Sequence, residues 1–162
     1  MNDDPRPARS ARIERLIEAP QADVFAAWAD SDLLARWLPP VGLSLDIESF
    51  EFREGSTLAL VFNYGQADPW AKTGVDHTSV RMRFAEISAP DRLRLEVTFL
   101  TDQPGFEVPM RSTWTYEPIG PHTRVVVETE DIPEGMAIED HKSGVTALLA
   151  NLARVMKPVS KV

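Results

Sequence analysis

His141 is the side chain best placed for chemistry, because it falls on an apolar stripe near the end of the chain. It precedes Val145 by four residues and Leu148 by seven, a spacing that puts all three on one face of a helix. A neutral imidazole there can hydrogen-bond a ligand or act as a base near pH 7. The competing interpretation is a hydrogen-bonded structural histidine, buried or at a rim, beside Asp140.

The motifs of the common enzyme classes are missing from the chain. There is no Gly-x-Ser-x-Gly, no Gly-x-Gly-x-x-Gly and no phosphate-binding loop. The three histidines, His77, His122 and His141, lack the His-x-x-x-His spacing of a zinc site. The chain has no cysteine, which removes thiolate ligands, disulfides and cysteine nucleophiles. We therefore expect no catalytic residue, no metal and no cofactor.

Large apolar side chains at alternating positions are the other candidates, as walls of a pocket. Trp114 shares a predicted strand face with Met110 and Ser112, which makes it a better pocket candidate than Trp37. Gly144 would either leave room for a ligand or allow close helix–sheet packing. Ordinary core is the competing interpretation, above all for Trp37. The candidate ligand-binding residues are His141, Trp114, Tyr116, Ser112, Met110, Met82, Phe84, Leu60, Phe62, Trp37, Gly144, Val145 and Leu148.

Arginines occupy the opposite faces of the same predicted strands. We expect them to pair with Glu96 and Glu128 on a solvated outer face, since cross-strand pairs of opposite charge are typical of such a surface. A phosphate or acidic-ligand site is the alternative. The arginines are Arg81, Arg83, Arg94 and Arg111.

The first elements that would position these residues are one strand and two short helices. Residues 11–18 predict a strand that stops before Pro20, which suits the first turn of a helix. Asp30 and Asp32 are good caps for a second helix over residues 33–37, and Pro39-Pro40 must end it.

Six alternating segments follow, and their short, turn-separated spacing predicts one antiparallel meander. Residues 63–76 are rich in Gly, Asp and Pro, and we expect them to form a loop over one mouth of the sheet. The segments cover residues 43–50, 58–62, 80–84, 93–99, 110–116 and 125–129.

A long helix ends the chain. Asp131 and Glu134 have the spacing of a capping start, so the helix is predicted over residues 134–157, before Pro158. One straight helix cannot close-pack along a strongly curved sheet, because such sheets twist. The space between them is either a filled core or a mostly apolar cavity, and this geometry favours ligand binding.

Length and charge limit which classes of function remain. With 162 residues the chain predicts one domain, over residues 11–158, between a disordered tail at 1–10 and a short tail at 159–162. The formal net charge of −8 argues against nucleic acid or an anionic membrane as partner. No secretory signal or membrane span is visible, so we expect a cytoplasmic protein.

Several short motifs, taken in order, resemble a known superfamily. They are Ile17-Glu18-Ala19-Pro20 with Val24-Phe25-Ala26-Ala27-Trp28, residues 33–39, Arg53-Glu54-Gly55-Ser56, residues 84–87 with Pro90-Asp91-Arg92-Leu93, residues 123–127, and Ser143-Gly144 with Leu148, Leu149 and Leu152. Over residues 12–157 the chain resembles the START-like (SRPBCC, helix-grip) superfamily and, within it, the family of the activator of heat-shock-protein-90 ATPase. Val145, Leu38 and Ser56 depart from the usual aromatic, aromatic and glycine.

The resemblance implies an α+β helix-grip fold, in which a curved antiparallel sheet of six or seven strands, two short helices and a long C-terminal helix enclose a cavity. For function, we expect non-enzymatic binding of a small apolar or aromatic ligand by a monomer or homodimer. One alternative is a co-chaperone-like protein-interaction module with a chaperone partner and a place in the stress response. The other is a cyclase or dehydratase with His141 as base.

Overall fold

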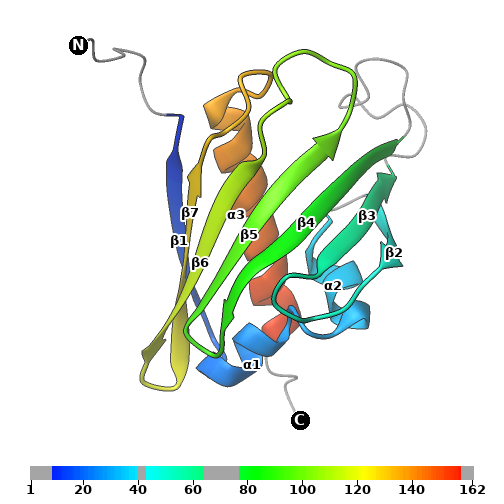
Figure 1. The fold of residues 1–162 in the computed structure, drawn as a ribbon. Helices are drawn as coiled ribbons and strands as arrows, with labels where there is room; N and C mark the ends of the chain where they lie inside the picture. Colours follow the sequence, from blue (N-terminus) through cyan, green and yellow to red (C-terminus); the bar gives the residue numbers. More distant parts are fainter. Residues whose placement is uncertain (1–8, 40–42, 64–76, 158–162) are drawn as a thin grey trace.

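One curved sheet and one long helix dominate this computed structural model, which describes residues 9–39, 43–63 and 77–157 (Figure 1). The elements in chain order are β1 (Ala11–Ile17), α1 (Gln21–Ala26), α2 (Ser31–Trp37), β2 (Ser44–Ser49), β3 (Thr57–Asn63), β4 (His77–Ser88), β5 (Arg92–Leu100), β6 (Met110–Ile119), β7 (His122–Glu130) and α3 (Ile138–Met156). The predicted α+β helix-grip fold is confirmed.

The sheet is antiparallel throughout, with the strand order β1-β7-β6-β5-β4-β3-β2. Strands β2 to β7 form the predicted meander, since each pairs with the next in the chain. Strand β1 joins the far edge by pairing with β7, where Ile13 lies opposite Val127. The first strand and the last strand of the chain therefore lie side by side.

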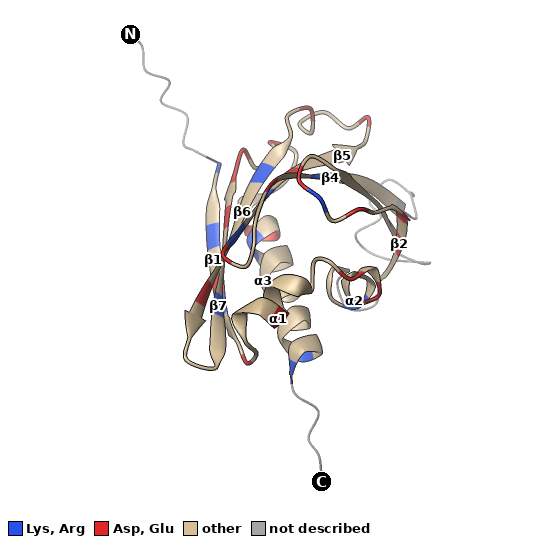
Figure 2. Cartoon of the chain, turned by 60° about the horizontal axis from the view of Figure 1, so that its bottom comes forward, with Lys and Arg blue, Asp and Glu red and all other residues tan. Residues whose placement is uncertain are grey.

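Alternation along the strands separates an inner face from an outer face. On β6, Met110, Ser112, Trp114 and Tyr116 are buried whereas Arg111 is exposed. Figure 2 shows the sheet as an arch with α3 inside it. Helix α3 packs against β1 and α2. The short helices contact the sheet elsewhere, α1 on β6 and β7 and α2 on β2.

The two short helices begin and end for local reasons. Asp30 caps α2, because its carboxylate accepts hydrogen bonds from the backbone N–H groups of Asp32 and Leu33. The helix begins at Ser31, two residues earlier than predicted, and Pro39 follows its end. Pro20 precedes α1 as its N-cap, in extended conformation.

The predicted start of the last helix is wrong. Helix α3 begins at Ile138, not at residue 134, and its N-cap Ala137 offers no side-chain hydrogen bond. Asp131 has a positive φ of 59° and pairs with Arg111 at 2.8 Å, so it caps no helix. The Gly135 N–H donates to the Gly105 carbonyl at 3.1 Å, in the loop between β5 and β6. These long-range contacts place the segment before α3, so the local capping pattern of Asp131 and Glu134 does not set the start of the helix.

Arg9 holds the segment that leads into α3. Its guanidinium donates to the carbonyls of Ile132 and Pro133, each at 2.9 Å, and to that of Met136. Its own carbonyl accepts from the Ile132 N–H at 3.0 Å. Carbonyl groups just before the helix are thus satisfied by a side chain from the other end of the chain.

Some predicted segments lie outside the described residues. These are residues 1–8 of the expected N-terminal tail, 64–76 of the expected loop and the tail at 159–162. Asn63, the first residue of that expected loop, belongs to β3. In the part of the chain that the structure describes, no helix is both long enough and apolar enough to cross a bilayer.

Candidate functional site

Most predicted ligand-binding residues meet between the inner face of the sheet and α3. Those that are buried are Leu60, Phe84, Met110, Ser112, Trp114, Tyr116, Trp37, His141 and Val145. Phe62, Met82 and Leu148 are half-buried, and Gly144 is exposed. A Cβ on Gly144 would meet no atom within 4 Å, so the expectation of close helix–sheet packing at this glycine is wrong.

A strip of polar side chains crosses the inner face where β6, β7 and α3 meet. His141 Nε2 lies 3.0 Å from Thr129 Oγ1, and Trp114 Nε1 donates to Ser112 Oγ at 3.1 Å. Ser112 and Thr129 lie directly opposite each other on neighbouring strands. We call Ser112, Thr129 and His141 the polar strip.

The polar strip accounts for one ring nitrogen of His141, as the structural interpretation of this residue expects. Burial lowers the pKa of His141 below its ordinary value, so the ring is neutral near pH 7. Thr129 was missed as a site residue, although it continues the alternation of Val125 and Val127. Its cross-strand position beside Ser112 was the signal that could have found it.

Trp28 is the centre of an aromatic cluster below the polar strip. Its ring lies edge-to-face on Trp37 at 5.0 Å, Trp114 at 5.2 Å and Phe84 at 6.2 Å between centroids. Trp37 is fully buried and donates its indole N–H to the Ala27 carbonyl at 3.2 Å. This environment supports core as the role of Trp37.

Two buried polar atoms of this cluster, Trp28 Nε1 and Tyr116 Oη, lie next to each other and meet no other polar group among the residues that the structure describes. Tyr116 packs edge-to-face on Phe25 at 5.0 Å, and its burial raises the pKa of the phenol. The indole N–H of Trp28 opposes that rise, which places the two groups near each other. Trp28 lies between α1 and α2, outside every predicted strand, and the sequence marks it only as the end of the motif Val24-Phe25-Ala26-Ala27-Trp28.

Inner-face apolar side chains become half-exposed toward the end of the sheet where β3 and β5 finish. Phe99 lies opposite the buried Val80, and Met82 lies opposite the buried Val97. Phe62 ends the inner face of β3 in the same half-buried state. We call Phe62, Met82 and Phe99 the apolar rim. It continues the buried core into a region that solvent reaches.

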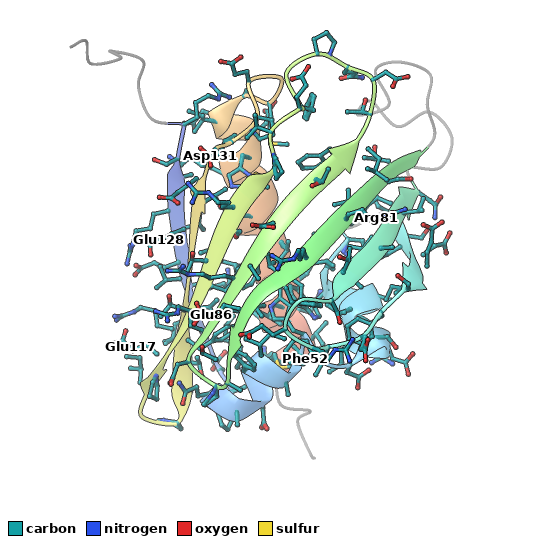
Figure 3. All side chains as sticks on the ribbon, viewed as in Figure 1. Phe52, Arg81, Glu86, Glu117, Glu128 and Asp131 are labelled. Carbon is teal, nitrogen blue, oxygen red and sulfur yellow. The ribbon has the colours of Figure 1, made fainter. Side chains whose placement is uncertain are left out.

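The outer face carries ion pairs, as expected for Arg83 with Glu96, which lie 3.2 Å apart. Arg94 pairs with Glu86 at 3.4 Å, and hydrogen bonds from Ser88 and Arg92 lower the pKa of Glu86. The expectation for Glu128 is wrong, because it forms no ion pair with any residue that the structure describes. Figure 3 shows Glu86, Glu128 and Asp131 along this side of the sheet.

A hollow of about 970 Å³ lies on the outer face across β5, β6 and β7. Its polar lining includes Arg92, Arg94, Arg111, Thr113, Thr115 and Glu128. Within residues 9–39, 43–63 and 77–157, no three His, Asp or Glu side chains gather as metal ligands.

Solved structures with similar folds come from several bacteria. A protein from Chromobacterium violaceum is 25% identical with a TM-score of 0.81, and the match covers 93% of this chain and 98% of that one. One from Arthrobacter aurescens is 24% identical with a TM-score of 0.77, covering 94% and 89%. The AHSA1 protein from Silicibacter pomeroyi is 18% identical with a TM-score of 0.71, covering 90% and 95%.

Family membership rests on the sequence match rather than on these structures alone. No curated protein sequence matches the chain. Residues 18–157 match the family model described as Activator of Hsp90 ATPase homolog 1-like protein. Because this match spans most of the chain and agrees with the helix-grip fold, the chain belongs to the Activator of Hsp90 ATPase homolog 1-like family of the START-like superfamily.

Proposed function

We propose that the protein binds a small, mostly apolar ligand, without catalysis, between the inner face of the sheet and α3. The observation that carries the proposal is the apolar rim. Phe62, Met82 and Phe99 come from three adjacent strands and point to the inner face, yet none is fully buried.

Covering the apolar rim would be favourable. Removal of apolar surface from water contributes about 25 cal/mol per Å², and contiguous exposed apolar patches often mark binding sites. The rim is also continuous with the buried core, since Phe84 lies two residues beyond Met82 on β4. A ligand seated at the rim would therefore extend an existing core rather than create an isolated contact.

The polar strip supplies the few polar groups that such a pocket needs for orientation. Ser112 Oγ accepts one hydrogen bond and keeps its own proton available, and the neutral His141 ring has a second nitrogen. Helix α3 contributes Val145 and Leu148 opposite the sheet. These groups support a ligand that is apolar over most of its surface.

Nile red fluorescence tests the proposal, because this neutral dye brightens when it leaves water. Met82→Gln should weaken Nile red binding at least severalfold, because it places an amide in the apolar rim. Arg83→Gln is the matched control, one residue away on the outer face, and should leave the affinity unchanged. Equal affinities in both variants, or no binding by the wild-type protein, would contradict the proposal.

The second candidate function is a co-chaperone-like interaction, favoured by the family description and by the outer-face hollow. In this case the partner is an Hsp90-type chaperone and the hollow is the contact. The measurement is the ATPase rate of the chaperone from the same organism with and without the protein. Stimulation that Arg94→Glu abolishes would support this role, and an unchanged rate would dispose of it.

A further inference from the structure

Strand β1 is an open edge of the sheet. It stands at one end of the strand order and pairs with β7, and no strand in the described part of the chain bonds its other side. Figures 1 and 2 both show β1 at the margin of the molecule, with no helix or strand drawn beyond it. The unpaired N–H and C=O groups of such an edge are a template for another strand.

The side chains of β1 are exposed on both faces toward its end. Ile13 and Ile17 pack into the core, so the residues between them alternate between the inner face and the outer face. Leu16, on the outer face, is 47% exposed, and Arg15, on the inner face, is exposed as well. Because neither face is covered at this point, a second strand has access to the edge.

The charges of β1 suit a second copy of the same strand. Charged side chains on an edge strand commonly prevent pairing, but here their signs are self-complementary. Arg12 and Glu14 lie on the outer face, on either side of Ile13. When two copies pair antiparallel about Ile13, each Arg12 lies directly opposite Glu14 of the second copy, an arrangement that stabilises a sheet.

The same charges disfavour the neighbouring registers. Pairing about Arg12, Glu14 or Arg15 places that residue opposite its own equivalent, and like charges directly opposite each other are destabilising. Of the registers centred on residues 12–15, the one about Ile13 is therefore the one that the charges favour. In that register the half-buried Ile13 meets its own equivalent on the inner face.

Arg12 and Glu14 already form an ion pair within one chain. Arg12 Nη1 lies 2.6 Å from Glu14 Oε2, and the two side chains are 57% and 43% exposed. In the paired arrangement the two residues and their equivalents form a quartet in which the signs alternate, so each glutamate lies beside two arginines. A single exposed ion pair contributes little to stability, whereas several charges in a network contribute more.

We propose that the chain forms a symmetric homodimer in which two β1 strands pair antiparallel about Ile13 and the two sheets join into one. Each copy contributes the same residues to this interface, as a two-fold axis requires. A strand edge buries less surface than a standard interface, so the dimer has modest affinity and forms as the concentration rises. The proposal does not depend on ligand binding, because the apolar rim lies on β3, β4 and β5.

Sedimentation velocity of the full chain over a concentration series tests the dimer. Wild type should shift from monomer to dimer as the concentration rises. Arg12→Glu and Glu14→Arg should each raise the dissociation constant of the dimer by about fivefold or more, because each places two pairs of like charge opposite each other. Arg83→Glu is the matched control, since it makes the same change in net charge on β4 and should leave the dissociation constant unchanged.

A mixture of the two single variants tests the register. One copy with Arg12→Glu and one with Glu14→Arg again place opposite charges together, so the mixture should form a heterodimer about as tightly as wild type dimerises. The double variant Arg12→Glu/Glu14→Arg should dimerise by itself for the same reason. Both positions are exposed, so all variants should fold, and a thermal melt close to that of wild type checks this.

The remaining outcomes overturn the proposal. A wild-type chain that stays monomeric at every concentration has no such interface. A dimer that both single variants leave intact uses another surface, and a dimer that Arg83→Glu weakens equally responds to net charge alone. Single variants that stay monomeric when they are mixed contradict pairing about Ile13.

Discussion

At the scale of single residues, the interior of the protein is defined by which polar atoms are satisfied. His141 and Thr129 satisfy each other across the contact of α3 with β7, and Ser112 satisfies Trp114. Trp28 Nε1 and Tyr116 Oη lie next to each other and meet no other polar group in the described part of the chain. The first two pairs therefore stabilise the fold as it stands.

Thr129→Val tests the contribution of the polar strip to stability. The substitution keeps the shape of the side chain and leaves His141 Nε2 buried without its partner, so the unfolding free energy should fall by about 1–3 kcal/mol. Urea denaturation measures this change. Thr113→Val, on the outer face of β6, is the control and should change stability by less than about 0.5 kcal/mol.

Burial of His141 also predicts a pH dependence of stability. Its pKa in the folded protein lies below the ordinary value of 6.5, so between these two values the unfolded chain binds more protons than the folded one. The unfolding free energy therefore rises with pH across this window. The contribution of His141 to stability is lost as the pH falls from 6.5 toward the lowered pKa. Urea titrations at several pH values should show the slope.

His141→Gln is the control for this slope, since glutamine does not titrate. If His141 causes the slope, the difference in unfolding free energy between wild type and variant should change with pH below 6.5. A difference that does not change with pH would mean that another histidine is responsible and would contradict the assignment. The same position decides the enzymatic alternative, which stays a prediction. A cyclase or dehydratase with His141 as base would lose its rate in His141→Ala while keeping ligand affinity.

At the scale of elements, the segment from β7 to α3 is placed by distant contacts rather than by its own sequence. Arg9 bonds three of its carbonyls, and Gly135 bonds Gly105 of the loop between β5 and β6. A Cβ on Gly135 would overlap the ring of Phe106. The start of α3 therefore depends on how this loop packs.

Gly105→Ala tests that packing. Gly105 has a φ of 93°, which alanine rarely adopts, and its Cβ would come within 2.6 Å of the Gly135 backbone nitrogen. We expect a loss of about 1–3 kcal/mol in unfolding free energy, because a change in the φ of residue 105 or a shift of the Gly135 backbone would each cost energy. A variant as stable as wild type in thermal unfolding would contradict the described loop contact.

Gly144→Ala is the matched substitution, and here we expect the unfolding free energy to rise rather than fall. Gly144 lies inside α3, and a Cβ there meets open space. Alanine has the higher helix propensity, so unfolding free energy should rise by up to ~1 kcal/mol. A loss of stability in the same thermal assay would show that the helix approaches the sheet more closely than described. Reduced Nile red affinity would support the expectation that this glycine leaves room for a ligand.

At the scale of the whole molecule, charge and apolar surface are segregated. The chain carries a net charge of −8, and charged residues on the strands, such as Arg83, Arg94 and Arg111, are exposed. Apart from the polar strip, the inner face is apolar from the buried core to the apolar rim. A ligand that enters the core therefore binds the folded state and not the unfolded chain.

Ligand binding should consequently raise the thermal stability of the protein. At a free Nile red concentration one hundred times its Kd, the unfolding free energy should increase by about 2.7 kcal/mol. A concentration-dependent rise in Tm in the wild type, reduced in Met82→Gln, is the expected result. A Tm that does not change with dye would indicate nonspecific surface binding.

The sequence by itself determined the strands, their faces and the meander, because these depend on local periodicity. Period-two alternation placed Ser112, Trp114 and Tyr116 on one face, and the structure confirms that placement. Turn-separated strands in succession pair with their neighbours, so the order followed from the same pattern. Asp30 as the cap of α2 was predictable for the same local reason.

Only the tertiary structure decided which polar groups are paired and where α3 begins. The bonds from Arg9 span more than 120 residues, and Thr129 meets His141 only because the chain turns back to lay α3 against the sheet. Local patterns report how each segment is buried, but a hydrogen bond depends on the final distance between segments. For that reason the candidate residues were largely visible in the sequence, whereas the pairing of His141 with Thr129 emerged only from the packed interior.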